Sequence, residues 1–145
     1  MKIAIGADHK GFAQKELIKK NLNTAIDWID VGTFDTKRTD YPIFAQKVAQ
    51  LIQKKEVQAG LLLCATGIGM AISANRFANI YAGLVWNKKI AKLAKEDDNV
   101  NVLVIPSDFV SNDQLIPIIT SWLNAQFKGE RYQQRLDIID QWGGL

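Results

Sequence analysis

Runs of consecutive apolar residues alternate along the chain with segments in which apolar residues recur every three or four positions. The consecutive runs predict β-strands, and the periodic segments predict amphipathic helices. The predicted strands are 2–7, 26–31, 60–65, 80–85 and 101–105. The predicted helices are 11–22, 42–53, 68–77, 88–96, 113–126 and 130–140.

Four of these strands, all except 26–31, are nearly continuous apolar runs, which is typical of strands covered on both faces. Strands of this kind that alternate with helices predict a parallel sheet with helices on both sides. We therefore expect one α/β domain over residues 1–145, a three-layer α/β/α sandwich around a five-stranded parallel sheet. In such folds ligands bind at the carboxyl ends of the strands.

The glycine turn after the third predicted strand is the first candidate site. Cys64-Ala65-Thr66-Gly67-Ile68-Gly69 follows an apolar run and precedes a predicted helix. Backbone amides and the dipole at a helix N-terminus attract anions and lower the pKa of a nearby thiol. We therefore expect an anion site beside an acidic thiol. The structural alternative is that Cys64 is only a small buried apolar residue.

Composition limits the class of protein. The 145 residues are 48% hydrophobic and 23% charged, as in soluble globular domains. The net charge of +3 is small and interspersed, which does not favour a nucleic-acid partner. The sequence has no membrane-length apolar run and no signal-peptide pattern, and a single cysteine cannot form an internal disulfide. We expect a cytoplasmic protein with no membrane partner.

Polar residues elsewhere extend the candidate site. They are Asp8 and His9 after the first strand, Tyr41 after the second, Asp97 and Asp98 after helix 88–96, and Arg131 and Arg135 on the last helix. We expect them to converge at one edge of the sheet. Each also has a structural alternative: Asp8 as a helix cap, His9 as a polar loop residue, and the arginines as solvated side chains.

Several common sites are excluded by their missing residues. The glycine turn lacks the third glycine of a dinucleotide fingerprint and the ending of a phosphate-binding loop, and no Gly-x-Ser-x-Gly elbow is present. One histidine and one cysteine in separate loops make a metal site improbable. What remains is small-anion binding with proton transfer at Cys64. Aldose–ketose isomerisation needs such a base, donors for the enediolate and cations for a phosphate.

At these residues the chain resembles the ribose-5-phosphate isomerase B family, which also includes the galactose-6-phosphate isomerase subunits. The matching segments are 1–9, 32–33, 39–42, 64–69, 74–76 and 131–135. The resemblance implies a Rossmann-like fold and conversion of a sugar phosphate, ribose 5-phosphate to ribulose 5-phosphate, through a cis-enediolate. It also implies a homodimer or homotetramer with sites at the subunit interface, and no metal or organic cofactor.

The resemblance further assigns roles. Cys64 is the expected base, Thr66 its enediolate partner, and Asp97 stands at the position of a ring-opening histidine. The expected substrate-binding residues are Asp8, His9, Tyr41, Ala65, Gly67, Ile68, Gly69, Asp98, Arg131 and Arg135. Ala65 replaces a family glycine, which is tolerated if its φ is negative.

Three acidic residues depart from the family pattern. Asp97 and Asp98 replace a histidine and an asparagine, and Asp108 replaces a phosphate-binding arginine. These changes leave two other hypotheses open. In the first hypothesis, the chain is one subunit of a hetero-oligomeric galactose-6-phosphate-type isomerase. In the second, it is a catalytically weak sugar-phosphate-binding paralogue.

Overall fold

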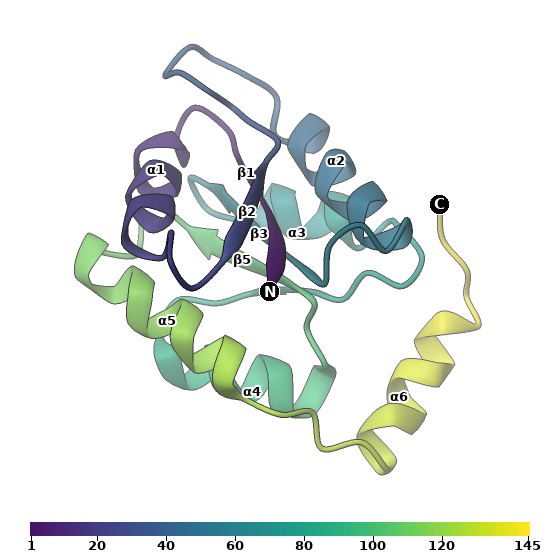
Figure 1. The fold of residues 1–145 in the computed structure, drawn as a ribbon. Coiled ribbons are helices and arrows are strands. Elements are labelled where there is room, and N and C mark those ends of the chain that lie inside the picture. Colours follow the sequence, from purple (N-terminus) through teal and green to yellow (C-terminus); the bar gives the residue numbers. More distant parts are fainter.

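A five-stranded parallel sheet forms the centre of the computed structural model, which describes all residues 1–145 (Figure 1). The strands are β1 (Lys2–Ala7), β2 (Asp27–Asp30), β3 (Ala59–Cys64), β4 (Ala82–Leu84) and β5 (Val102–Pro106). Their order across the sheet is β2-β1-β3-β5-β4, and every pairing is parallel. The predicted five-stranded parallel sheet is confirmed.

Six helices accompany the sheet. They are α1 (Phe12–Asn21), α2 (Tyr41–Gln53), α3 (Ile68–Ala74), α4 (Lys88–Asp98), α5 (Asn112–Asn124) and α6 (Arg131–Asp140). Helices α1, α4 and α5 cover one face, and α2 and α3 cover the other, while α6 lies outside both layers (Figure 1). None of the helices combines the length and the apolar character that crossing a membrane requires.

Two apolar cores, one on each face, follow from the alternation of side chains along the strands. In β3, Leu61 and Leu63 belong to the 18-residue core under α1, α4 and α5. Leu62 and Cys64 belong to the 13-residue core under α2 and α3. The thiol therefore lies on the α2/α3 face, at the carboxyl end of a central strand.

Some expectations about elements are wrong. Strand β4 is half-buried along its three residues, not covered on both faces, because it lies at the edge of the sheet and pairs only with β5. Helix α3 ends at Ala74, three residues early. Helix α4 runs two residues further than predicted, to Asp98, and ends where Asn99 takes a left-handed conformation with φ 48°.

A buried lysine joins α1 to the edge strand β2, which the apolar pattern of α1 does not predict. The Lys15 side chain is completely buried, and its ammonium donates to Asp30. Lys19 donates to the same carboxylate at 2.6 Å. Burial raises the pKa of Asp30, but the hydrogen bonds from both lysines and from the Gly32 amide outweigh it, so the net pKa is lowered. The carboxylate therefore stays charged and holds the two lysines.

Helix α6 is held at its far end by contacts outside the helix. The Tyr81 hydroxyl donates to the Asp140 carboxylate at 2.8 Å. Burial and this carboxylate raise the pKa of Tyr81 to about 12, so the phenol remains a donor. Beyond the helix, the Leu145 amide donates to the Arg76 carbonyl at 3.0 Å, and Gln53 Nε2 donates to the Leu145 carbonyl at 2.9 Å.

Candidate active site

A cavity of about 370 Å³ opens at the carboxyl ends of β1 and β3. Its lining residues are Asp8, Tyr41, Cys64, Ala65, Thr66, Ile68, Gly69 and Ile72. Seven of these eight were predicted as site residues, and Ile72 was missed. Ile72 lies four and three positions after Ile68 and Gly69 in the predicted helix 68–77, and this helical spacing was the available signal. The cavity therefore unites the first-strand and third-strand parts of the predicted site.

The backbone of the glycine turn explains its sequence. Gly67 has φ 72°, and a Cβ there would lie 2.4 Å from Leu84 Cδ1, so only glycine fits. Ala65 is not among the non-glycine residues with positive φ, which meets the condition for its replacing a glycine. Thr66 is exposed, and its Oγ1 accepts a hydrogen bond from the Ile68 amide at 3.3 Å. The hydroxyl proton of Thr66 is thus free to be donated to a ligand.

The thiol is less acidic than the sequence predicts. Burial raises the pKa of Cys64 above its ordinary value, and hydrogen bonds from the amides of Met70 and Gly67 only partly oppose this. The negative charges of Asp8 and Asp108 raise the pKa further. The expectation that the helix N-terminus lowers the pKa of the Cys64 thiol is therefore wrong for the single chain. Helix α3 has only seven residues, and the desolvation of a cysteine that is 4% exposed outweighs the effect of the helix amides.

The first loop supplies two fixed polar groups. The buried Asp8 carboxylate accepts hydrogen bonds from the amides of Lys10 at 2.9 Å and Gly11 at 3.1 Å, so it orders the loop and also lines the cavity. His9 Nδ1 accepts the Thr39 amide at 3.3 Å. The ring hydrogen of His9 therefore lies on Nε2, which is left to donate.

Tyr41 closes one side of the cavity. Its ring packs so tightly on Gly69 that a Cβ there would lie 2.3 Å from Tyr41 Cζ. Gly69, predicted as a binding residue, thus also makes room for the tyrosine. The pocket wall depends on this glycine.

The remaining predicted residues lie at the opposite edge of the sheet. Helix α4 connects the parallel strands β4 and β5, so it runs back and its end, Asp97 and Asp98, lies near the amino ends of the strands. A second cavity, of about 690 Å³, lies between β4, α4 and α6 and is lined by both aspartates but not by Cys64. The expectation that all candidate residues meet at one edge is wrong within one chain.

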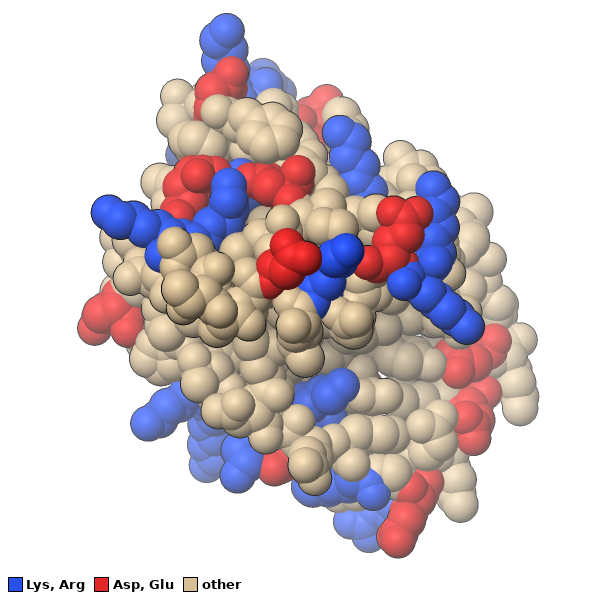
Figure 2. All heavy atoms as spheres, in the orientation of Figure 1, with Lys and Arg blue, Asp and Glu red and all other residues tan.

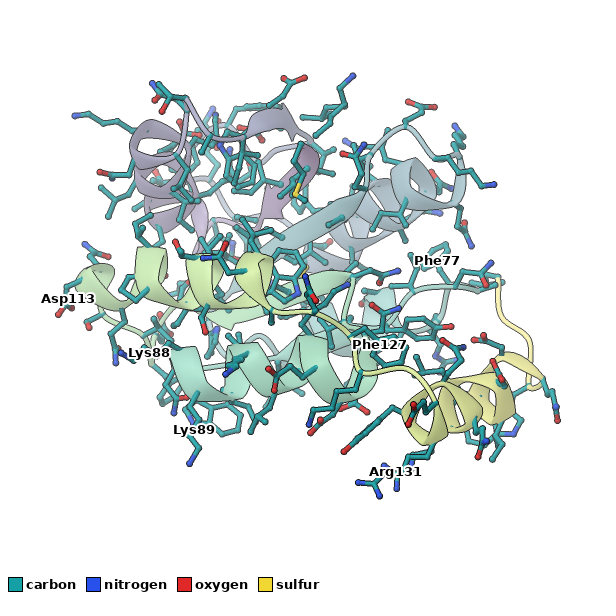
Figure 3. The ribbon with its side chains drawn as sticks, turned by 60° about the horizontal axis from the view of Figure 1, so that its bottom comes forward. Phe77, Lys88, Lys89, Asp113, Phe127 and Arg131 are labelled. Carbon is teal, nitrogen blue, oxygen red and sulfur yellow. The ribbon has the colours of Figure 1, made fainter.

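A basic cluster forms at this opposite edge. Lys128 donates to Asp97 at 2.7 Å, and Lys128, Arg131 and Arg135 lie 5.0, 5.1 and 5.3 Å from the centre of the Tyr132 ring. Figure 3 shows Arg131 at the start of α6, pointing away from the sheet. The sequence reasoning missed Lys128, although a lysine just before the two arginines was visible. The cluster presents three cations to whatever lies beside α6.

Asp108 lies on the Cys64 side of the molecule. Its amide donates to the Ala65 carbonyl at 3.0 Å, which fixes the loop after β5 against the glycine turn. Over the face drawn in Figure 2, positive and negative side chains are interspersed. No group of three or more His, Cys, Asp or Glu side chains is placed to hold a metal ion.

A parallel three-layer sandwich with a ligand-sized cavity at the carboxyl ends of its central strands defines a Rossmann-like α/β protein that binds a small molecule. A model of the Ribose/Galactose Isomerase family matches residues 3–139. The chain belongs to this family, as its sequence motifs indicated.

Individual relatives are similar over nearly the whole chain. Ribose-5-phosphate isomerase B of Escherichia coli K12 is 40% identical over 139 residues, 95% of this chain and 93% of the relative. A ribose 5-phosphate isomerase structure from Thermotoga maritima matches with a TM-score of 0.94 and 39% identity, covering 97% of both chains. The Mycoplasma genitalium enzyme, solved with bound ribulose-5-phosphate, matches with a TM-score of 0.91 and 36% identity over 97% of this chain and 95% of that one.

Proposed function

We propose that the chain interconverts ribose 5-phosphate and ribulose 5-phosphate. The observation that carries the proposal is the thiol pocket at the end of β3 in a chain of the Ribose/Galactose Isomerase family. The reaction moves hydrogen within one molecule, so it consumes no oxidant and needs no redox cofactor. A cytoplasmic location fits a pocket whose cysteine works as a free thiol.

Cys64 acts as the base in the proposed mechanism. In the aldose-to-ketose direction its thiolate takes the proton from C2 and later returns it to C1. The hydroxyl proton of O2 moves to O1, so the carbonyl passes from C1 to C2 and atoms and charge balance. Thr66 donates to the enediolate oxygen, while Asp8 and Tyr41 contact the sugar hydroxyls.

A second copy of the chain completes each site in this proposal. The cations that would hold the phosphate, Arg131 and Arg135, lie across the molecule from the thiol of their own chain. Apolar side chains are exposed at both places, Ile72 (60% exposed) beside the pocket and Trp142 (77% exposed) after α6. A two-fold contact that seats α6 beside the partner's pocket covers both surfaces and brings the arginines to the thiol. The assembly is then a homodimer, or a homotetramer built from such dimers.

An NMR assay of the purified chain with ribulose 5-phosphate tests the function. We expect formation of ribose 5-phosphate, and a fall of roughly 10²–10⁴-fold in kcat for Cys64→Ala, since that is the usual contribution of a general base. Cys64→Ser, which keeps the size of the side chain but supplies a much weaker base, should behave like the alanine variant. Full turnover by Cys64→Ala would disprove the mechanism.

The position of Asp108 favours one alternative. A carboxylate beside the glycine turn repels a phosphate dianion placed there. If the chain is a weakly catalytic sugar-phosphate-binding paralogue, calorimetry detects tight binding of ribose 5-phosphate without turnover. If it is instead a subunit of a galactose-6-phosphate-type isomerase, the homo-oligomer is inactive until a partner chain is added.

A further inference from the structure

We propose that Lys128 keeps the phosphate subsite on α6 cationic by neutralising the carboxylate of Asp97. The inference rests on the proposed function, in which Arg131 and Arg135 hold the phosphate of the sugar. It adds to that subsite a residue that determines how strongly a phosphate binds there. The observations that carry it are the ion pair between Asp97 and Lys128 and the position of this pair beside the arginines.

Lys128 is fixed at two points on the end of α4. Its ammonium donates to Asp97 Oδ1 at 2.7 Å, and its backbone amide donates to the Glu96 carbonyl at 3.0 Å. Gly129 and Glu130, with φ values of 69° and 51°, connect the lysine to α6. The ammonium is therefore held next to Asp97 and close to the first turn of α6.

The ion pair lies in the same charged cluster as the arginines. Lys128 Nζ is 5.0 Å from the centre of the Tyr132 ring. The guanidinium carbons of Arg131 and Arg135 are 5.1 and 5.3 Å from the same point, and neither arginine makes an ion pair. Three cations and one carboxylate leave this cluster with a net charge of +2. A phosphate monoester carries about −1.5 to −2 at pH 7, so the two charges match.

Tyr132 responds to the charges of this cluster. The hydrogen bond from Arg131 lowers the pKa of Tyr132 most, desolvation opposes it, and the charges of Arg131 and Lys128 lower it further. The charge of Asp97 acts in the opposite direction. Because the net pKa is lowered, the cations outweigh the carboxylate at the phenol.

Without Lys128, the Asp97 carboxylate would repel a phosphate bound by the arginines, and only solvent and salt would weaken the repulsion. The side chains of the pair are 34% exposed at Asp97 and 42% exposed at Lys128. An ion pair this exposed adds little to folding stability. We therefore expect its consequence in anion binding and not in the stability of the fold.

Binding of inorganic phosphate, followed by ³¹P NMR at about 0.1 M ionic strength, tests the inference. We expect Lys128→Met to weaken phosphate binding and Asp97→Asn to strengthen it, each by roughly threefold to tenfold. The variant with both changes should bind phosphate about as tightly as the wild type, and so should Lys128→Arg, which keeps the charge. In turnover assays, Lys128→Met should raise the KM for ribulose 5-phosphate more than it lowers kcat.

The opposite directions of the two single changes distinguish this role from a structural one. Both changes break the same ion pair, so a pair that only ties α6 to α4 would make both variants bind phosphate more weakly. Lys89→Met is the control for loss of a lysine. Lys89 is exposed in the first turn of α4, at the end away from Arg131, so its removal should leave phosphate binding unchanged (Figure 3).

The outcomes separate this inference from the proposed function. Weaker phosphate binding by Asp97→Asn, or unchanged binding by Lys128→Met, overturns the inference and leaves the isomerase function intact. Failure of the wild type to convert ribulose 5-phosphate overturns the proposed function, while the order of the phosphate affinities still decides the role of Lys128.

Discussion

At Cys64, burial and the local backbone shift the pKa of the thiol in opposite directions. Desolvation raises its pKa more than the amides of Met70 and Gly67 lower it. Because the thiolate is the active base, we expect kcat/KM for ribulose 5-phosphate to rise with pH through an inflection above the ordinary thiol pKa. A pH profile of kcat/KM measures this inflection.

Asp108 provides the control for this assignment. Its charge raises the pKa of Cys64, while its contact with Ala65 is made by its backbone amide. Asp108→Asn keeps that amide and removes the charge, so the rising limb of the profile should move to lower pH. A limb that stays in place would show that the inflection belongs to another group.

At the scale of elements, the apolar periodicity predicts most helices and strands because each buries one face or two faces against the sheet. It misses Lys15, a charged residue in the middle of α1, since its burial depends on Asp30 of another element. It overestimates β4 because an apolar run does not reveal which strand lies at the edge. Pairing partners and edges are tertiary properties, whereas periodicity is local.

The contact between α1 and β2 depends on Asp30. Asp30→Asn leaves the fully buried Lys15 with the partly exposed Glu16 as its only counter-charge and should lower the free energy of unfolding by roughly 3 kcal/mol at pH 7. The pKa of this carboxyl is lowered by folding, so its contribution is complete above its unfolded value of about 4 and disappears as pH falls through the lower folded value. Urea unfolding at pH 7 and in acid should show that the difference in unfolding free energy between the wild type and Asp30→Asn becomes smaller as the pH falls.

Lys15→Met is the matched control, because it removes the buried charge and leaves Asp30 paired with Lys19. Replacing a buried ion by an apolar side chain is often neutral or stabilising. If Lys15→Met destabilises the protein more than Asp30→Asn, the ion pair is not what makes Asp30 important.

Helix α6 should loosen when Gln53 loses its amide. Gln53→Leu removes the donor to the carbonyls of Leu145 and Ala78. Hydrogen exchange at the Leu145 amide and in α6 should accelerate by about tenfold at most, as expected for about 1 kcal/mol, with β3 unchanged. Gln50→Leu, an exposed change on the same helix, should alter neither. Equal exchange in both variants would mean that Gln53 does not hold the helix.

At the scale of the whole molecule, the sequence predicts which residues belong to the site better than where they lie. Asp8 follows β1, Cys64 ends β3, and Tyr41 lies at the end of the connection from β2 to α2, so their common cavity could be predicted from a parallel sheet. Asp97 ends a helix that connects two parallel strands, and such a helix must run back to the amino ends. That signal was present in the predicted order of elements, and it separates Asp97 from the thiol of its own chain.

This separation makes subunit complementation the decisive test of the assembly. Chains carrying Cys64→Ala and chains carrying both Arg131→Ala and Arg135→Ala should each be inactive as homodimers. In a heterodimer isolated with two different tags, one site receives both defects and the other receives none, so activity should return to about half that of the wild type. A dimer that pairs wild type with a chain carrying all three changes should be inactive, because each of its sites then contains one defect. Were the site complete within one chain, the first heterodimer would stay inactive and the second would keep half its activity.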